Sequence, residues 1–193
     1  MGIGSAHGSY RNGLTSERAG LRVDLLVSDT SVLVDLKRGS LLEAAFGLPY
    51  RFVVPDLLYE RELRDHGGDE FVGLGLVVAD LTGEQVELAQ AYKREKPALS
   101  SPDVFALALA KAEGGTLLTG DKRLRSLAAK ERVACHGLLW LFDEMHLDGI
   151  ATEALTAGLQ AIRAHPRCRL PPREVNKRLA KYGIAVAPDV GPA

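Results

Sequence analysis

The sequence predicts a three-layer α/β/α fold, with a central, mostly parallel sheet of four to five strands and a helical C-terminal extension. Short apolar runs alternate with amphipathic stretches along most of the chain. Strands that alternate with helices form βαβ units, whose strands are parallel and whose helices cover both faces of the sheet. From about Gly137 onward only helical patterns are found, which predicts the extension.

The expected strands are short runs rich in branched apolar residues, as is typical of buried strands. They are residues 23–28 (VDLLVS), 51–54 (RFVV), 76–79 (LVVA), 116–119 (TLLT) and a short fifth at 133–136 (VACH). Residues 30–46 carry an apolar helical face that Gly39 can interrupt, and a helix carrying Leu57, Leu58 and Leu63 follows the second strand.

Prolines and serines mark the next helices. A polar helix runs from about Thr82 to Lys96, where Pro97 stops it. Ser101 can cap the helix that follows, and Pro102 fits its first position. The three helices of the extension are expected at LLWLFDEMHL, ATEALTAGLQAIRAH and PREVNKRLAKYG.

The composition divides the chain into four segments. Residues 1–22 have no apolar h-region, so they are not a secretory signal, and they are expected to be a disordered extension or a remnant of cloning. Residues 23–142 are expected to form the α/β domain and residues 143–184 a helical extension packed on it. Residues 185–193 are expected to be a disordered tail.

Charge and cysteine usage narrow the class of protein. The 193 residues carry a net charge of −1, which gives no global attraction to nucleic acid. Cys135 and Cys168 form no CxxC pair, and no apolar run reaches the roughly 18 residues that a membrane span requires. We therefore expect a reduced, cytoplasmic protein that makes no membrane contact.

Four acidic residues are expected at one edge of the sheet, outside the carboxyl ends of the strands, where open α/β sheets bind ligands. Asp29 follows the first strand, Glu60 lies in the first turns after the second, and Asp121 follows the fourth. Asp103, at the start of a helix, would have to reach the same edge. Each acid alone has an ordinary explanation as a helix cap or a solvated side chain. Four of them at one edge favour a shared function.

Clustered carboxylates predict a bound cation. Two unit charges about 4 Å apart repel by about 4 kcal/mol at an effective dielectric near 20, and a cation relieves that repulsion. Oxygen ligands suit Mg²⁺ or Mn²⁺, so one or two such ions are expected. This arrangement is suited to hydrolysis of a phosphodiester by water.

Two glutamates compete for the position after the second strand. Residues two apart on an α-helix point about 200° away from each other, so only one of them can face the site. The spacing from Pro55 favours Glu60, and Glu62 stays open as the alternative.

Four stretches of the chain resemble the PIN-domain nucleases. They are LLVSDTSVLVDL around Asp29, VVPDLLYEREL around Glu60, LSSPDVFALALAKAEGGTLLTGDKRLRSLA around Asp103 and Asp121, and VACHGLLWLF after them. The resemblance covers about residues 23–142. Its most specific part is the Asp-x-x-x-x-Ala-x-x-x-Ala helix that leads into Leu-Leu-Thr-x-Asp.

The resemblance implies a metal-dependent endoribonuclease that hydrolyses RNA through a quartet of acids. By matching position, the quartet of catalytic and metal-binding residues is Asp29, Glu60, Asp103 and Asp121, and the flanking hydroxyl residues expected to contact RNA are Ser31 and Thr119. Bacterial and archaeal members are often the toxin of a toxin–antitoxin pair. The resemblance therefore also implies a small antitoxin protein as partner, and we expect a homodimer.

Basic residues lie beside this predicted site. Lys122, Arg123 and Arg125 oppose the helix dipole, which favours anions at a helix start, but they are well placed to contact RNA phosphates. A second basic stretch runs from Arg163 to Lys181. It is a candidate surface for RNA or for an acidic partner, or a solvated helix face.

Two other functions stay open. The long extension motivates a catalytically silent module that binds RNA or a protein partner. A phospho-acceptor aspartate is the weaker alternative, because Asp29-Thr30-Ser31-Val32 lacks the second Asp of a DxD phosphatase. Zinc-site spacings, a Walker A loop, a GxSxG elbow and a GxGxxG loop are all absent from the sequence.

Overall fold

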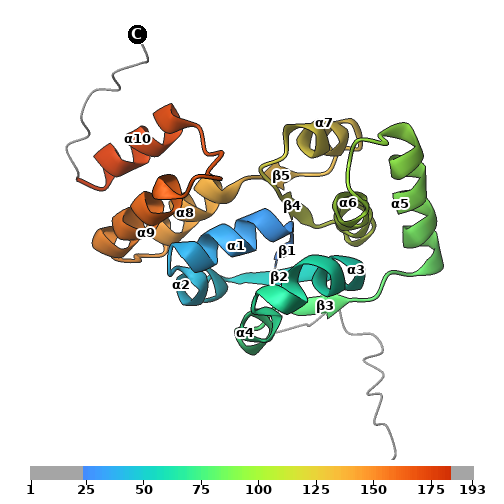
Figure 1. Ribbon diagram of the computed structural model, residues 1–193, viewed down its shortest axis with the longest axis horizontal. Helices are drawn as coiled ribbons and strands as arrows, with labels where there is room; N and C mark the ends of the chain where they lie inside the picture. Colours follow the sequence, from blue (N-terminus) through green and yellow to red (C-terminus); the bar gives the residue numbers. More distant parts are fainter. Residues whose placement is uncertain (1–23, 184–193) are drawn as a thin grey trace, which may run out of the picture.

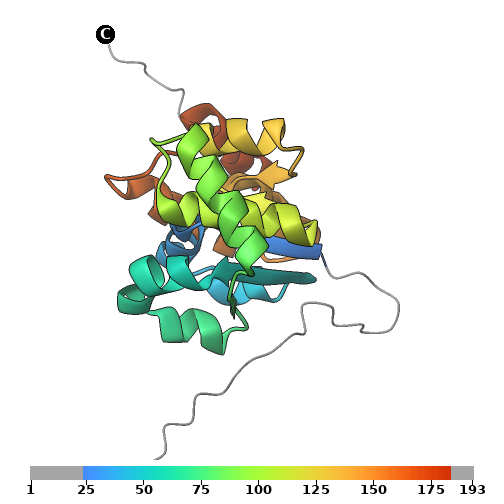
Figure 2. The ribbon, with the colours of Figure 1, turned by 90° about the vertical axis from the view of Figure 1, so that its right-hand side faces the viewer.

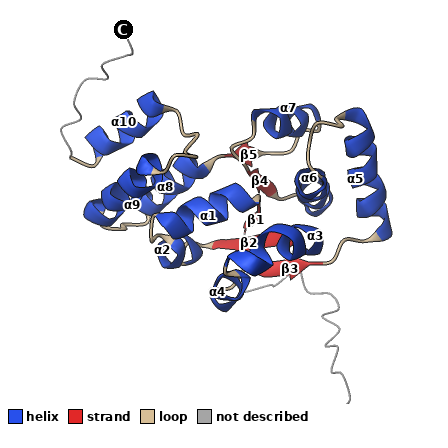
Figure 3. Ribbon diagram, in the orientation of Figure 1, coloured by secondary structure: helices blue, strands red, loops and turns tan. Residues whose placement is uncertain are grey.

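The computed structural model of the protein describes residues 24–183. Its centre is a sheet of five strands in the order β3-β2-β1-β4-β5, and every neighbouring pair is parallel. Helices lie on both sides of this sheet (Figures 1 and 3). The predicted α/β/α architecture is therefore confirmed. The segments predicted to be disordered, 1–22 and 185–193, lie outside the described residues.

The strands form close to the predicted apolar runs. They are β1 (Asp24–Ser28), β2 (Tyr50–Pro55), β3 (Val77–Ala79), β4 (Thr116–Leu118) and β5 (Cys135–His136). The central strands β1 and β2 both end in consecutive buried residues, because helices cover both faces of the sheet there.

The carboxyl ends of β1 and β4 lie side by side. Ser28 pairs with Leu118 in the parallel register. The Asp29 backbone N–H, one residue further, donates to the Leu118 carbonyl at 2.9 Å. Residues that directly follow the two strands therefore begin at the same edge of the sheet.

Two groups of helices cover the sheet. One face carries α1 (Thr30–Arg38), α2 (Leu42–Phe46), α8 (Leu138–Leu147) and α9 (Thr152–Ala164), with α10 (Pro172–Lys181) outside them (Figure 1). The other face carries α6 (Ser101–Glu113), with α3 (Asp56–Leu58) and α7 (Lys122–Lys130) beside it and α5 (Gly83–Glu95) outside it (Figures 1 and 2). The remaining elements connect β2 to β3, and they are η1 (Tyr59–Leu63), η2 (Arg64–His66) and α4 (Gly68–Gly73).

Helix α6 is apolar on nearly all sides, because it lies between the sheet and α5. Every residue from Ala106 to Ala110 is at most 1% exposed. A helix covered on two sides needs apolar residues around its circumference, which explains the sequence VFALALA. The polar helix α5 begins after Thr82, as predicted, and Thr82 forms a capping box with Gln85.

The predicted cap of α6 is wrong by one residue. Ser100, not Ser101, is the N-cap, since its hydroxyl accepts from the Asp103 N–H at 3.2 Å. The Asp103 carboxylate in turn accepts from the Ser100 N–H at 3.0 Å. This reciprocal arrangement requires an acceptor three residues after the cap, and Asp103 has that spacing only from Ser100. Ser101 and Pro102 are then the first two helical residues.

The predicted helix after β2 is not a uniform α-helix. Three residues of α3 pass into the π-helical turn η1, which is followed by the 3-10 turn η2. Leu58 and Leu63 are both fully buried. On an α-helix, residues five apart point about 140° away from each other, whereas the wider i→i+5 turn brings them towards one face. The short helix α4 was not predicted, because its six residues include two glycines and carry a weak helical signal.

The apolar core is continuous from the sheet to the C-terminal helices. Leu141 and Phe142 of α8 and Val175 of α10 belong to the same cluster of buried residues as the central strands. The predicted boundary after residue 142 falls within α8. None of the described helices has the length and apolar composition needed to cross a membrane.

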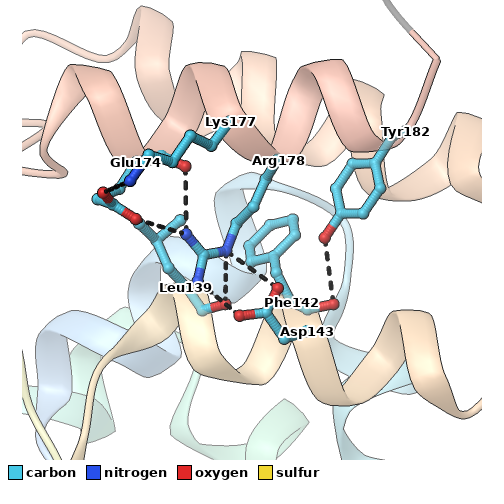
Figure 4. Close-up of polar contacts among 7 residues, drawn as sticks. All are labelled: Leu139, Phe142, Asp143, Glu174, Lys177, Arg178 and Tyr182. Atoms are coloured by element: carbon cyan, nitrogen blue, oxygen red, sulfur yellow. Dashed lines mark hydrogen bonds and ion pairs between the residues drawn. The ribbon is translucent and has the colours of Figure 1, made fainter.

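One arginine fixes α10 on α8 (Figure 4). Arg178 donates to the two carboxylate oxygens of Asp143, at 3.2 Å and 2.5 Å, and to the Leu139 carbonyl at 3.1 Å. One turn later, the Tyr182 hydroxyl donates to the Phe142 carbonyl at 3.3 Å. The Arg178 side chain is only 17% exposed, so the ion pair is largely shielded from water and its bidentate geometry defines the position of α10.

Two glycines allow α1 and α9 to touch backbone to backbone. A Cβ on Gly158 would lie 2.5 Å from Leu41 Cδ1 and 2.8 Å from the Gly39 carbonyl oxygen. A Cβ on Gly39 would lie 3.2 Å from the Gly158 carbonyl oxygen. Gly39 also ends α1, so the predicted interruption of this helical stretch is confirmed.

Gly158→Ala is expected to lower the melting temperature. At an open helix position this change gains up to about 1 kcal/mol from helix propensity. Here the new methyl group meets backbone atoms that cannot rotate away, and overpacking costs about 1–3 kcal/mol. The change in melting temperature, measured by thermal unfolding, reports the gain in helix propensity and the cost of overpacking together. Gly83→Ala is the control, since nothing lies within 4 Å of its new methyl group. An unchanged or raised melting temperature for Gly158→Ala would contradict the close contact.

Candidate active site

The strand order reverses beside the central strand, and this defines one point on the edge formed by the carboxyl ends of the strands. From β1 the chain moves outward to β2 and β3 on one side, and it returns as β4 and β5 on the other. The order therefore reverses between β1 and β4, and α/β sheets bind ligands at such a point. Asp29 follows β1, and Asp121 comes three residues after the end of β4.

Asp29 is an almost buried carboxylate, with 7% of its surface exposed. It caps α1, because its Oδ1 accepts from the Val32 N–H at 3.1 Å and from the Ser31 hydroxyl at 2.8 Å. A capping side chain between a buried strand and a helix is fixed in both position and orientation. Asp29 is therefore the best-anchored acid at this edge.

Thr119 connects Asp29 to the turn that carries Asp121. Its side chain is fully buried and hydrogen-bonds to the Asp29 carboxylate, which can only accept, so the hydroxyl donates. The same hydroxyl oxygen accepts from the Asp121 N–H at 3.1 Å. The sequence predicted contact of Thr119 with RNA, whereas the structure buries its side chain. Thr119 instead positions two of the acids.

Asp121 caps α7 and Asp103 completes the capping box of α6, each with one carboxylate oxygen. Asp121 Oδ1 accepts from the N–H groups of Arg123 and Leu124, at 2.7 Å and 2.9 Å. Asp103 Oδ2 accepts from the Ser100 N–H. Within residues 24–183, the second oxygen of each carboxylate makes no hydrogen bond, so both remain available to a ligand.

The two glutamates that compete for the second position have different surroundings in the structure. Glu60 is exposed and forms an ion pair with Arg64 at 2.5 Å. Glu62 is half-buried and accepts a hydrogen bond from the hydroxyl of Thr30, the residue after Asp29. The π-helical turn η1 changes the direction of each side chain along it, which the α-helical spacing from Pro55 did not take into account.

Glu62 is thus the glutamate that contacts α1, through Thr30, and Thr30 is a residue of this edge that sequence reasoning missed. The sequence could have indicated this role, because Thr30 directly follows Asp29 and places a hydroxyl in the first turn of the helix that begins there.

The sequence of the chain matches a known protein family. A model described as DUF3368, a PIN domain, matches residues 25–183. The chain belongs to the PIN-domain family. No curated protein matches the chain. The match extends beyond the sheet and includes the helices α8, α9 and α10.

The PIN domain is a nuclease fold, and two acids of this edge, Asp29 and Asp103, interact electrostatically here. Burial raises the pKa of Asp29 above its ordinary value, and the nearby charge of Asp103 raises it further. Hydrogen bonds from Thr119, Ser31 and the Val32 N–H oppose this rise. The ionised form of Asp29 is thus costly in the folded protein, and a nearby cation would offset the cost.

The donor set of this PIN domain fits a hard divalent cation in its chemistry. Asp29, Glu62, Asp103 and Asp121 offer only carboxylate oxygens, which Mg²⁺ and Mn²⁺ prefer. Within residues 24–183, however, no group of three or more His, Cys, Asp or Glu side chains is close enough to hold a metal ion as it stands.

The predicted RNA-contacting cations lie on the surface beside Asp121. Lys122 and Arg123 are exposed, and their side chains have no partner within the described part of the chain. Arg125 donates to the Thr119 carbonyl at 3.3 Å. Ser31 is exposed as well, but its hydroxyl donates to Asp29. Contact of these residues with RNA stays a prediction.

Asp29→Asn is expected to raise the melting temperature at neutral pH in metal-free buffer. Asn caps a helix about as well as Asp, and it removes a buried charge. The raised pKa of Asp29 means that its protonated form stabilises the fold, and this stability is lost as pH rises through that pKa. The gain over wild type should therefore shrink as pH falls.

Thermal unfolding between pH 4 and pH 8 measures this difference. Asp121→Asn is the control, because it changes a helix cap at an exposed position and should give no such gain. A lower melting temperature for Asp29→Asn at neutral pH would contradict the cost assigned to the buried carboxylate.

Proposed function

We propose that this PIN domain is a metal-dependent endoribonuclease that uses Asp29, Glu62, Asp103 and Asp121. One observation carries the proposal. The buried Asp29 is hydrogen-bonded to Thr119, which also binds the backbone of Asp121, at the point where the strand order reverses. Such an arrangement costs stability unless the acids serve a ligand, because buried carboxylates are expensive without a cation.

The residues have separate tasks in this proposal. Asp29 would provide the fixed carboxylate, and Asp103 and Asp121 would each offer the oxygen that capping leaves free. Glu62 would complete the ligand set, with Thr30 holding it beside α1. A divalent cation bound to these oxygens would stabilise negative charge on a phosphodiester and lower the pKa of an attacking water.

The basic residues Lys122 and Arg123 would hold the RNA backbone next to the acids. Contacts of Lys and Arg with phosphates position a nucleic acid without reading its sequence. This accounts for cations at a helix start, where the dipole disfavours them.

A second candidate, a catalytically silent module that binds RNA, is favoured by a different observation. The acids do not yet form a group that could enclose an ion within the described residues. The two candidates differ in one outcome only, because both predict RNA binding but only the nuclease predicts cleavage.

The remaining expectations are predictions from the sequence and from the resemblance to the family. They are the toxin role, a small antitoxin partner, the homodimer and a cytoplasmic location.

The nuclease proposal predicts cleavage of single-stranded RNA in Mg²⁺ or Mn²⁺, and no cleavage in EDTA. Asp121→Asn should lower the rate of RNA cleavage by at least about tenfold, since it removes one carboxylate from the group proposed to hold the cation. Gel analysis of a labelled RNA measures the rate. Full activity in EDTA, or no activity in either metal, would refute the nuclease.

The two glutamates provide a matched pair for the same assay. Glu62→Gln should lose activity like Asp121→Asn, whereas Glu60→Gln should retain it, because Glu60 pairs with Arg64 on the surface. Both changes remove one charge from the same helical turn. If Glu60→Gln lost activity and Glu62→Gln retained it, Glu60 would be the second acid of the site.

A further inference from the structure

Three exposed arginines occur close together in the sequence, two in the connection from α9 to α10 and one in the first turn of α10. Arg167, Arg169 and Arg173 are exposed, and within residues 24–183 their side chains have no hydrogen-bond or ion-pair partner. Of the other cations on these helices, Lys181 lies at the far end of α10 and three have partners. Arg163 donates to Asn176, Lys177 pairs with Glu174, and Arg178 pairs with Asp143.

The surrounding sequence provides no acid to neutralise the three arginines. Between Glu153 and Glu174 the chain has no Asp or Glu, and Glu174 itself is bound to Lys177 and Arg178. The protein as a whole has a net charge of −1, so this is a local concentration of positive charge.

The direction of α10 places these arginines towards the acidic edge. Arg178 contacts the Leu139 carbonyl, and Tyr182 contacts the Phe142 carbonyl, so α10 and α8 run in the same direction (Figure 4). The start of α10 therefore lies towards the start of α8, which follows the carboxyl end of β5. Figure 1 shows this end of α10 on the side of β5.

The basic residues of α7 lie along the same edge. Arg125 donates to the Thr119 carbonyl at 3.3 Å, and its Nη1 would lie 3.4 Å from a Cβ on Gly137, the residue between β5 and α8. Basic residues thus lie at two places along this edge: on the first turn of α7, beside the end of β5, and towards the start of α10.

The segment that carries the arginines is restrained. Pro166, Pro171 and Pro172 limit its backbone freedom, and the Cys168 N–H donates to the His165 carbonyl at 2.9 Å. Rigid presentation lowers the entropy that is lost on binding.

We propose that Arg167, Arg169 and Arg173 form a second RNA-binding surface, the arginine arm, which holds the phosphate backbone beside the acidic edge. The inference rests on the proposed function for its choice of RNA. An arginine fork binds two phosphate oxygens at once, and unpaired arginines are free to do so.

Charge also favours RNA over a protein partner. Protein interfaces depend on a buried apolar or aromatic anchor. The large exposed apolar residues of residues 24–183 are Val72, Val78 and Leu147, and none of them belongs to the arm.

The arm is tested by equilibrium binding of a fluorescein-labelled single-stranded RNA to the full chain in EDTA, followed by anisotropy. The triple variant Arg167→Gln, Arg169→Gln and Arg173→Gln should raise Kd by about tenfold or more. The slope of log K against log salt should become shallower by about 2, since each lost phosphate contact contributes about 0.7.

A second triple variant is the matched control. Arg163→Gln, Lys177→Gln and Lys181→Gln removes the same charge from α9 and α10, but from two cations that have partners and from one at the far end of α10. It should change Kd by less than about twofold. Thermal unfolding confirms that both triple variants are folded.

If the two triple variants lowered the RNA affinity equally, the proposal of the arginine arm would be wrong, because the loss of charge alone would then explain the weaker binding. If the first variant bound RNA as tightly as wild type, the proposal would also be wrong, and an acidic protein partner would be the alternative ligand of this surface. The cleavage assay distinguishes this failure from failure of the nuclease. Wild-type cleavage with an unaffected first variant refutes only the arm, whereas arm-dependent binding without cleavage refutes only the nuclease.

Discussion

The burial of the Asp29 carboxylate is the constraint on which the rest of the site depends. The residue lies where the central strand β1 passes into α1, and it is 7% exposed. Hydrogen bonds from Ser31, Val32 and Thr119 hold the carboxylate but do not cancel the cost of burying it, since its pKa remains raised. The fold therefore keeps an ionisable carboxyl group where its charged form is disfavoured, which is typical of functional sites.

The same constraint explains the neighbouring residues. Because Thr119 is buried and bonded to both Asp29 and the Asp121 backbone, the ends of β1 and β4 must stay in register. Asp103 and Asp121 each use one carboxylate oxygen at the start of a helix, and within residues 24–183 the other oxygen makes no hydrogen bond. Beyond the sheet, the backbone contact of Gly39 with Gly158 and the ion pair of Arg178 with Asp143 fix the C-terminal helices on this frame.

Much of the fold follows from sequence patterns, because strand and helix periods and the helix-stopping prolines are local signals. The strands, the starts of α1 and α5, and the positions of Asp29, Asp103 and Asp121 at one edge could be predicted in this way. The π-helical turn could not, since it depends on burying both Leu58 and Leu63, which is a tertiary requirement. The choice between Glu60 and Glu62 depends on that turn. The burial of Thr119 and the direction of α10 likewise depend on contacts between distant parts of the chain.

The central claim is that Asp29 belongs to one cation-binding group with Glu62, and not with Glu60. Isothermal titration of the metal-free protein with Mn²⁺ tests it most directly. Wild type and Glu60→Gln should bind Mn²⁺ with the same affinity, whereas Asp29→Asn and Glu62→Gln should each bind at least about tenfold more weakly. Mn²⁺ binding by Asp29→Asn that equals binding by wild type would contradict the account.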